Sequence, residues 1–241
     1  AKRSWRQDAH VALKALAKTH EGRTELAKIL NEKAIDRHKA ESILVALSNS
    51  KAPDAIQHLR RYAATVTDME LFAAAMEGVL KSMPEPEARR FCLEQAQKLA
   101  ENPDAAVEKL MFFIRGLRQD DDPPQVKVLR KILRRTKNEE LRVACVRSLA
   151  KWVLDGSEAR DDVLRILRQR LTDDNPAVRV AAARALGESG NVRYVRMLAP
   201  LLQDDDRSAR QAGAEGISAL LGWDFPGSVA GAELDAWIDQ L

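Results

Sequence analysis

The sequence has few of the residues on which metal sites and disulfide frameworks depend. Its 241 residues include two cysteines and four histidines, and no two histidines lie four residues apart. Cys92 and Cys145 fall on the apolar faces of predicted helices, which favours buried structural thiols over a disulfide. We therefore expect neither a bound metal nor a disulfide scaffold.

Signals for membranes, export and catalysis are also missing. No apolar run reaches the roughly 18 residues that suggest a membrane-spanning helix, and no secretory signal is visible. We expect a cytoplasmic protein, although a chain that begins with Ala1 leaves room for an upstream segment removed by processing. The sequence has no GxSxG motif and no phosphate-binding glycine loop. We therefore predict no catalytic residues, no cofactor and no enzymatic activity.

Aromatic residues are scarce and the net charge is small. Aromatic side chains make up 5% of the residues, which suits a core of alanine, leucine and valine. Charged residues make up 31%, yet the net charge is only +3. Such dense, mixed charge suits the large solvated surface of an elongated helical protein. The slight basic excess alone does not indicate a nucleic-acid partner.

One stretch, Leu171 to Gly187, organises the rest of the chain. Asp174 or Asn175 can cap a helix, and Pro176 fits the first helical turn, where an N–H group is not needed. Apolar residues then follow at helical spacing, and glycines at 187 and 190 suit the helix exit. The apolar positions are Val178, Ala181, Ala182, Ala185 and Leu186. A second helix is expected over 192–202.

The same unit recurs before and after this stretch. Arg179 maps to Arg210, 31 positions later, and to Arg142, 37 positions earlier. Repeated helix pairs at near-constant spacing are typical of a solenoid. Helical spacing also predicts a first helix over 4–19, with Trp5, His10 or Val11, Leu13, Leu16 and Ala17 on its inner side.

The acidic turn, the Asn-Pro pair, the Val-Arg pair and the alanine-rich run ending in Ala-Leu-Gly resemble HEAT repeats. The short period resembles in particular the HEAT-like repeats of phycobilin lyases. This resemblance implies an all-α fold, a right-handed α-solenoid of about seven antiparallel helix pairs. We expect a single HEAT-like solenoid over 1–241, with divergent pairs over 1–136, clear repeats over 138–222 and a capping segment over 223–241. Trp223, Phe225 and Trp237 either cover the last repeat or form an exposed aromatic patch.

In HEAT repeats, a turn aspartate and a helix arginine commonly form a ladder between neighbouring repeats. The matching positions here are Asp173 or Asp174 with Arg179, and one of Asp204 to Asp206 with Arg210. Asn138 stands where an aspartate would precede Arg142, which weakens the prediction of a rung there. The acidic runs 120–122 and 204–206 favour helix capping over a cation site.

Basic residues gather on one side of successive second helices. On the helix expected over 125–135, they lie opposite Val126, Leu129, Ile132 and Leu133. The resemblance places second helices on the concave surface, so these residues predict a basic track along it. The basic track consists of Lys127, Arg130, Lys131, Arg134, Arg165, Arg168, Arg193 and Arg196. Arg135 shares the helix 125–135, and earlier second helices add Arg60, Arg61, Arg89 and Arg90.

The basic track has three possible interpretations. One is a solvated, salt-bridged face without a binding function, and the other two are binding functions. The first is a non-catalytic scaffold whose concave face binds a protein partner, either an acidic segment or a helical one. The second is nucleic-acid binding along the phosphate backbone. HEAT-like DNA glycosylases also use an aromatic and acidic cluster, which has no match on adjacent second helices here. A phycobilin-lyase role rests on the resemblance alone. We expect a monomer.

Overall fold

The computed structural model describes residues 2–32, 35–117, 123–154 and 160–222. Every regular element in these ranges is a helix and none is a strand, so the predicted all-α fold is confirmed. None of the described helices combines the length and hydrophobicity that crossing a bilayer requires. Contacts between residues divide the chain into two compact units, Ala1–Phe91 and Cys92–Leu241.

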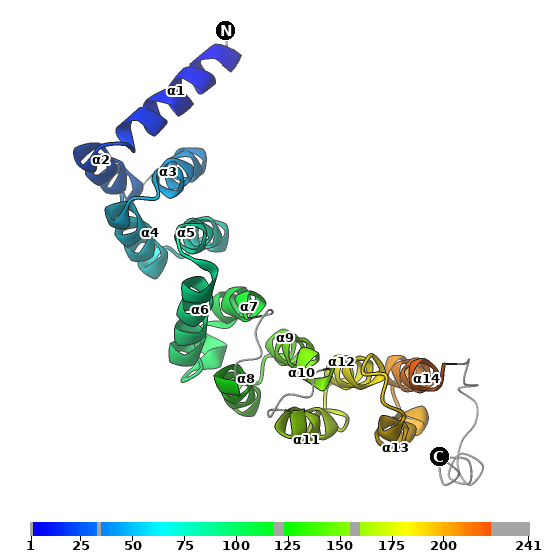
Figure 1. Cartoon of the computed structure of the whole chain (residues 1–241). Helices are drawn as coiled ribbons and strands as arrows, with labels where there is room; N and C mark the ends of the chain where they lie inside the picture. The colour runs from blue at the N-terminus through cyan, green and yellow to red at the C-terminus, as the bar shows by residue number, and fades with distance from the viewer. Residues whose placement is uncertain (1, 33–34, 118–122, 155–159, 223–241) are drawn as a thin grey trace. The chain divides into compact units, whose positions relative to one another are not determined.

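The first unit stacks its helices in two layers. The layer of α1, α3 and α5 packs beside the layer of α2 and α4, and successive helices of each layer contact one another (Figure 1). The boundary with the second unit falls inside α6. The helices are α1 (Lys2–Leu16), α2 (His20–Leu30), α3 (Arg37–Ser50), α4 (Pro53–Thr65), α5 (Met69–Lys81) and α6 (Glu85–Leu99).

The second unit repeats this two-layer arrangement. The helices α7, α9, α12 and α14 pack successively in one layer, while α8, α11 and α13 form the other (Figure 1). Short 3-10 helices, η1 (Pro103–Ala105), η2 (Val192–Tyr194) and η3 (Ala199–Gln203), join some of them. The α-helices are α7 (Val107–Gly116), α8 (Pro123–Arg135), α9 (Glu139–Leu149), α10 (Lys151–Leu154), α11 (Arg160–Arg170), α12 (Pro176–Gly187), α13 (Val195–Leu198) and α14 (Arg207–Leu221).

The described residues therefore contain six helix pairs, followed by α14 as a seventh first helix. In chain order the pairs are α1/α2, α3/α4, α5/α6, α7/α8, α9/α11 and α12/α13, with α10 following α9. The predicted capping segment, including Trp223, Phe225 and Trp237, lies outside the described residues. One continuous solenoid over 1–241, its right-handed sense and the concave position of the second helices stay predictions.

The organising stretch folds as its sequence predicts. Asn175 is the cap of α12, because its Oδ1 accepts a hydrogen bond from the Ala177 N–H at 2.8 Å, and Pro176 follows as the first helical residue. The apolar stripe from Val178 to Leu186 is buried. Gly190 adopts the left-handed conformation expected at the exit (φ +67°). Gly187 has a different role, because a Cβ there would lie 2.7 Å from the Cα of Gly216 on α14.

The second helix expected over 192–202 is broken into shorter pieces. Only Val195–Leu198 is α-helical, between η2 and η3. Pro200 explains the break, since proline lacks the N–H of an α-helical hydrogen bond and its ring clashes with the carbonyl of Arg196. The chain continues instead as a 3-10 helix, which buries Leu201 and Leu202.

The inner side predicted for the first helix is partly wrong. Val11 is 66% exposed, Leu16 is 45% exposed and His10 is also exposed, whereas Leu13 is half-buried and Ala17 is buried. The physical reason is that the described helices cover α1 from one side only. It packs on α2 and α3, and the three exposed side chains lie outside that contact.

Candidate functional site

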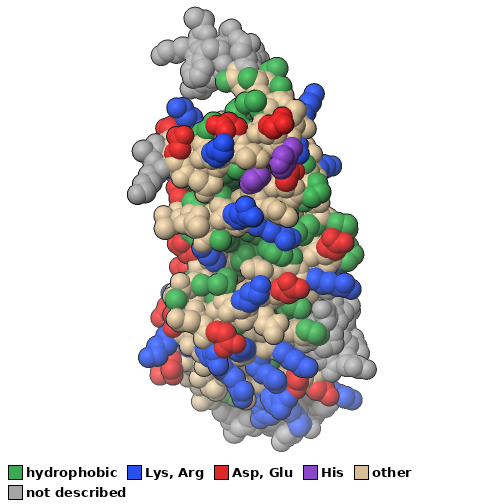
Figure 2. Space-filling model, turned by 90° about the vertical axis from the view of Figure 1, so that its left-hand side faces the viewer, with side chains coloured by type: hydrophobic (Ala, Val, Ile, Leu, Met, Phe, Trp, Pro, Cys, Tyr) green, Lys and Arg blue, Asp and Glu red, His purple; other side chains and the backbone are tan. Residues whose placement is uncertain are grey.

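Helix α8 presents the predicted basic face in the second unit. Val126, Leu129, Ile132 and Leu133 are all buried against the unit, at most 4% exposed. Lys127 and Arg134 are exposed on the opposite side, with Arg130 and Lys131 half-exposed between them. Lys and Arg side chains gather toward the lower end of the face in Figure 2, at the height of α8 in Figure 1. The amphipathic pattern of the sequence therefore determines this surface.

Glu101, just after α6, pairs with two cations of α8. One carboxylate oxygen accepts a hydrogen bond from the Lys131 Nζ, and the other lies 2.7 Å from Nη1 of Arg135. Arg135 also donates to the Glu101 carbonyl at 3.0 Å. The hydrogen bonds from Lys131 and then from Arg135 lower the pKa of Glu101 below its usual value. Glu101 is thus a carboxylate inside the basic region.

Asp162, in the first turn of α11, pairs with cations from two successive second helices. Its Oδ2 lies 3.6 Å from Nη1 of Arg130 on α8, and its Oδ1 pairs with Arg165 on α11. The solvent-facing sides of α8 and α11 therefore meet at this carboxylate. The structure brings Arg130 and Arg165 together at Asp162.

Four other residues of the track remain exposed without an ionic partner among the described residues. They are Lys127 and Arg134 on α8, Arg168 on α11 and Arg193 on η2. Arg196 on α13 is also exposed. The earlier arginines belong to the first unit, where Arg60 lies 4.7 Å over the Phe91 ring and Arg89 pairs with Glu85. The eight residues of the predicted track thus lie on α8, α11, η2 and α13 of the second unit.

The Arg–Asp ladder is present, but its partners differ from those predicted. Arg179 binds the Asp204 carboxylate of the following turn, with its Nη2 2.7 Å from Oδ1, and donates to the backbone carbonyls of Asp173 and Asp174. Arg210 likewise donates to the carbonyls of its own turn, at Asp204 and Asp205. Both arginines thus clamp the turn before their own helix, and Arg179 also binds the acidic turn of the next repeat.

A rung also forms at Arg142, where the sequence match to the ladder was weakest. Its Nη1 lies 2.7 Å from Oδ1 of Asp173, a side chain only 2% exposed. Asn138 does not prevent this rung, because its role is to cap α9 by accepting from the Leu141 N–H at 2.9 Å. The aspartate that matters is the one that follows the arginine, 31 residues later.

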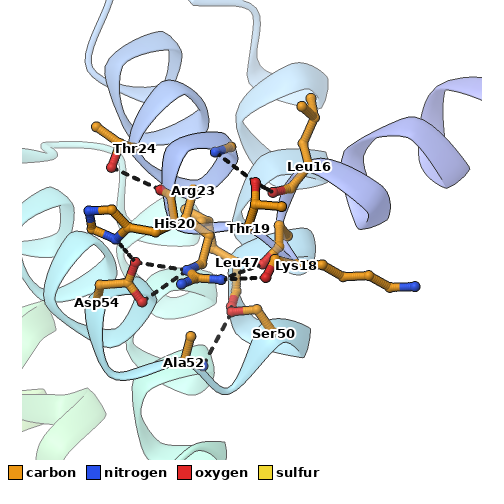
Figure 3. Close-up of polar contacts among 12 residues, drawn as sticks. Leu16, Lys18, Thr19, His20, Arg23, Thr24, Leu47, Ser50, Ala52 and Asp54 are labelled. Carbon is orange, nitrogen blue, oxygen red and sulfur yellow. Dashed lines mark hydrogen bonds and ion pairs between the residues drawn. The ribbon is translucent and has the colours of Figure 1, made fainter.

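Sequence reasoning missed a similar rung in the first unit. Arg23 on α2 donates through Nε to both carboxylate oxygens of Asp54, at 2.8 and 2.9 Å, and through Nη1 to the carbonyls of Ala17 and Lys18 (Figure 3). His20 Nδ1 lies 2.7 Å from the same carboxylate. Arg23 and Asp54 are 31 residues apart, as Arg142 and Asp173 are, so this spacing could have predicted the rung from the sequence. The ladder stabilises the stack and occupies its acidic residues.

We expect Asp54 to make the stability of the first unit depend on pH. The hydrogen bond from Arg23 outweighs the opposing effect of burial and lowers the pKa of Asp54 from 3.8 to about 2. Because the pKa of Asp54 is lower in the folded state, its carboxylate stabilises the fold at pH values above the unfolded-state pKa. This contribution to the free energy of unfolding, about 2 kcal/mol, is lost as the pH falls through the folded-state pKa. Denaturant unfolding of wild type and D54N should differ most at neutral pH and converge between about pH 4 and 2. A constant difference over this range would contradict the assignment.

The other candidate groups for chemistry do not assemble into a site. Among the residues that the structure describes, no group of three His, Cys, Asp or Glu side chains could hold a metal ion. Burial raises the pKa of the Cys92 thiol to about 11 and raises that of Cys145 further. Both cysteines are buried and unbridged, as predicted, and such thiols are poor nucleophiles.

Comparison with known protein families gave one match, to the region that contains the track. Residues 126–218 match a family model described as HEAT repeats. These residues therefore resemble HEAT repeats, as the sequence predicted. All eight residues of the predicted track lie within them, and so do both rungs of the ladder in the second unit. Glu101 precedes the HEAT repeats and pairs with residues inside them.

Comparison with individual proteins gave matches among solved structures only. No curated protein matched the sequence. An engineered protein solved by a structural genomics consortium is similar over 97% of this chain and 67% of its own, with 20% identity and a TM-score of 0.47. A second engineered protein is similar over 83% of this chain and 98% of its own, with 17% identity and a TM-score of 0.40. A chain from the complex of CpcE and CpcF of phycocyanin lyase from Nostoc sp. PCC7120 is similar over 96% of this chain and 86% of its own, with 12% identity and a TM-score of 0.38.

Proposed function

We propose that the chain is a non-catalytic scaffold that binds an acidic segment of a protein partner along the basic track. The HEAT repeats support an interaction role in general. The observation that carries the finer proposal is the set of four exposed cations, Lys127, Arg134, Arg168 and Arg193, that lack ionic partners among the described residues. They occupy three successive second-layer elements, α8, α11 and η2.

Two features favour a protein partner over nucleic acid. Glu101 and Asp162 interrupt the basic track, whereas a surface for a phosphate backbone gains from unbroken positive charge. The large apolar side chains of α8 face the core, and the HEAT-repeat part of the track carries no exposed aromatic side chain on which bases would stack. Carboxylates on flexible side chains of a protein segment fit separate cations between acidic side chains better than the evenly spaced phosphates of a nucleic-acid backbone do.

Charge reversal of the four unpaired cations tests this proposal. The variant K127E/R134E/R168E/R193E should lose at least about tenfold in affinity for a fluorescein-labelled poly-glutamate peptide, because attraction becomes repulsion at four positions. It should also recover less of any acidic partner from a cell extract. Fluorescence anisotropy over a series of salt concentrations measures the first effect, and a quantitative pull-down measures the second.

The matched control reverses the same number of exposed cations on the other layer. R147E/K151E/R184E/R207E alters α9, α10, α12 and α14, and none of these side chains has an ionic partner among the described residues. This control should bind poly-glutamate much better than the track variant does. Equal losses in both variants would show a general effect of net charge and refute the proposal. Tighter binding of duplex DNA than of poly-glutamate by wild type would favour the nucleic-acid alternative.

A further inference from the structure

The two carboxylates inside the basic track differ from those of the ladder. Glu101 is 64% exposed and Asp162 is 44% exposed, whereas the ladder carboxylates Asp173 and Asp204 are 2% and 12% exposed. Exposed ion pairs contribute little to stability because water and salt screen them. The ladder pairs hold repeats together, and the pairs in the track are weakly required for the fold.

Each of these exposed carboxylates also lies between two cations. Glu101 is held by Lys131 and Arg135, which are one turn apart on α8. Asp162 lies between Arg130 of α8 and Arg165 of α11. Two cations that converge on one carboxylate bind it more strongly than one isolated lysine or arginine does. The structure therefore contains two such carboxylate-binding sites, and each is occupied by a carboxylate of the chain itself.

We infer that Glu101 and Asp162 are internal competitors that occupy the two strongest carboxylate-binding positions of the basic track and lower its affinity for an acidic protein segment. This inference rests on the proposed function. A partner carboxylate replaces the internal one at little cost, because the exposed side chains of Glu101 and Asp162 can swing into water. The unpaired cations Lys127, Arg134 and Arg168 make the first contact, and the paired cations add affinity once the internal carboxylates leave.

The competitor role also sets the kind of partner. A segment gains the most affinity when its carboxylates reach both carboxylate-binding sites, one on α8 and one between α8 and α11. An acidic protein segment satisfies this with separate aspartate or glutamate side chains. Raising the salt concentration weakens the internal pairs and the partner contacts together. The competition is therefore best seen by removing the internal carboxylates at constant salt.

Neutralising the two competitors tests the inference. E101Q/D162N in the full chain should bind fluorescein-labelled poly-glutamate about threefold to tenfold more tightly than wild type, because four cations are released. The matched control E140Q/E188Q makes the same change of net charge at exposed positions on α9 and just after α12. It should raise the affinity by less than about twofold, the effect of weak long-range charge alone. Circular dichroism should show unchanged helix content in both variants.

The outcomes separate the inference from the proposed function. If K127E/R134E/R168E/R193E loses affinity while E101Q/D162N binds like wild type, the track is the site and the competitor role is wrong. If both neutralised variants gain equally, net charge explains the gain and the competitor role is also wrong. If wild type and E101Q/D162N both fail to bind poly-glutamate, the proposed function falls and the inference with it. A gain for duplex DNA that exceeds the gain for poly-glutamate overturns the assignment to an acidic protein segment.

Discussion

Replacing Gly187 with leucine is expected to destabilise the packing of α12 on α14 by about 2–3 kcal/mol. A Cβ at position 187 would lie 2.7 Å from the Cα of Gly216, and backbone atoms cannot rotate away as a side chain can. Leucine has a higher helix propensity than glycine, worth at most about 1 kcal/mol. The steric cost therefore outweighs the gain in propensity, and the two helices must move apart. Hydrogen exchange of the α12 and α14 amides, together with thermal unfolding, measures the loss.

Gly216→Ala is the informative control for this prediction. Its Cβ would approach Cδ1 of Leu198 at 2.8 Å, which is the far end of a flexible side chain, and the next contacts are at 3.4 Å or more. Leu198 can adjust, so this variant should change stability by less than about 1 kcal/mol. If Gly187→Leu were equally mild, the close approach of α12 and α14 would not be a requirement of the fold.

Replacing Asp204 with alanine is expected to cost about 2–3 kcal/mol, comparable to the loss from Gly187→Leu. Burial alone would raise the pKa of Asp204, but the hydrogen bond from Arg179 and that from the Asp206 N–H lower it overall. Arg179 is only 14% exposed, so removal of the carboxylate leaves a largely buried guanidinium without its counter-ion. Breaking such a pair costs more than the intact pair contributes.

Asp205→Ala is the matched control, because Asp205 is exposed and contributes only its backbone carbonyl to the ladder. It should change stability by less than about 0.5 kcal/mol. The two variants differ by one position and carry the same change of charge. Denaturant unfolding should place the Asp204→Ala midpoint well below that of Asp205→Ala. Coincident midpoints would show that the ladder does not stabilise the repeats.

Local chemistry made the clearest repeats predictable from the sequence. Asn175 and Pro176 specify where α12 begins, because an amide side chain caps free N–H groups and proline fits the first turn. The burial of Cys92, Cys145 and the stripe on α8 follows from helical periodicity. These features depend on neighbours within a few residues, which is the range over which sequence patterns act.

Features that depend on the next repeat were harder to predict. Arg179 pairs with Asp204 rather than with Asp173 or Asp174, since its guanidinium reaches across to the following turn while its own turn offers carbonyls. The exposure of Val11 reflects which side of α1 faces α2 and α3, which periodicity alone does not reveal. Ionic partners such as Glu101 for Lys131 come from a residue 30 positions away. A spacing of 31 between arginine and aspartate would have predicted the rungs Arg23–Asp54 and Arg142–Asp173, but not Arg179–Asp204, where the spacing is 25.

Chemical crosslinking tests the central claim, that the basic track is the binding surface, most directly. A zero-length reagent that joins lysine amines to carboxylates should be applied to the full chain with bound poly-glutamate, and the linked lysines identified by mass spectrometry. We expect links at Lys127 and Lys131 on α8, and a marked loss of both links in the presence of high salt. Links that fall mainly on Lys151 of α10 or on lysines of the first unit would contradict the account.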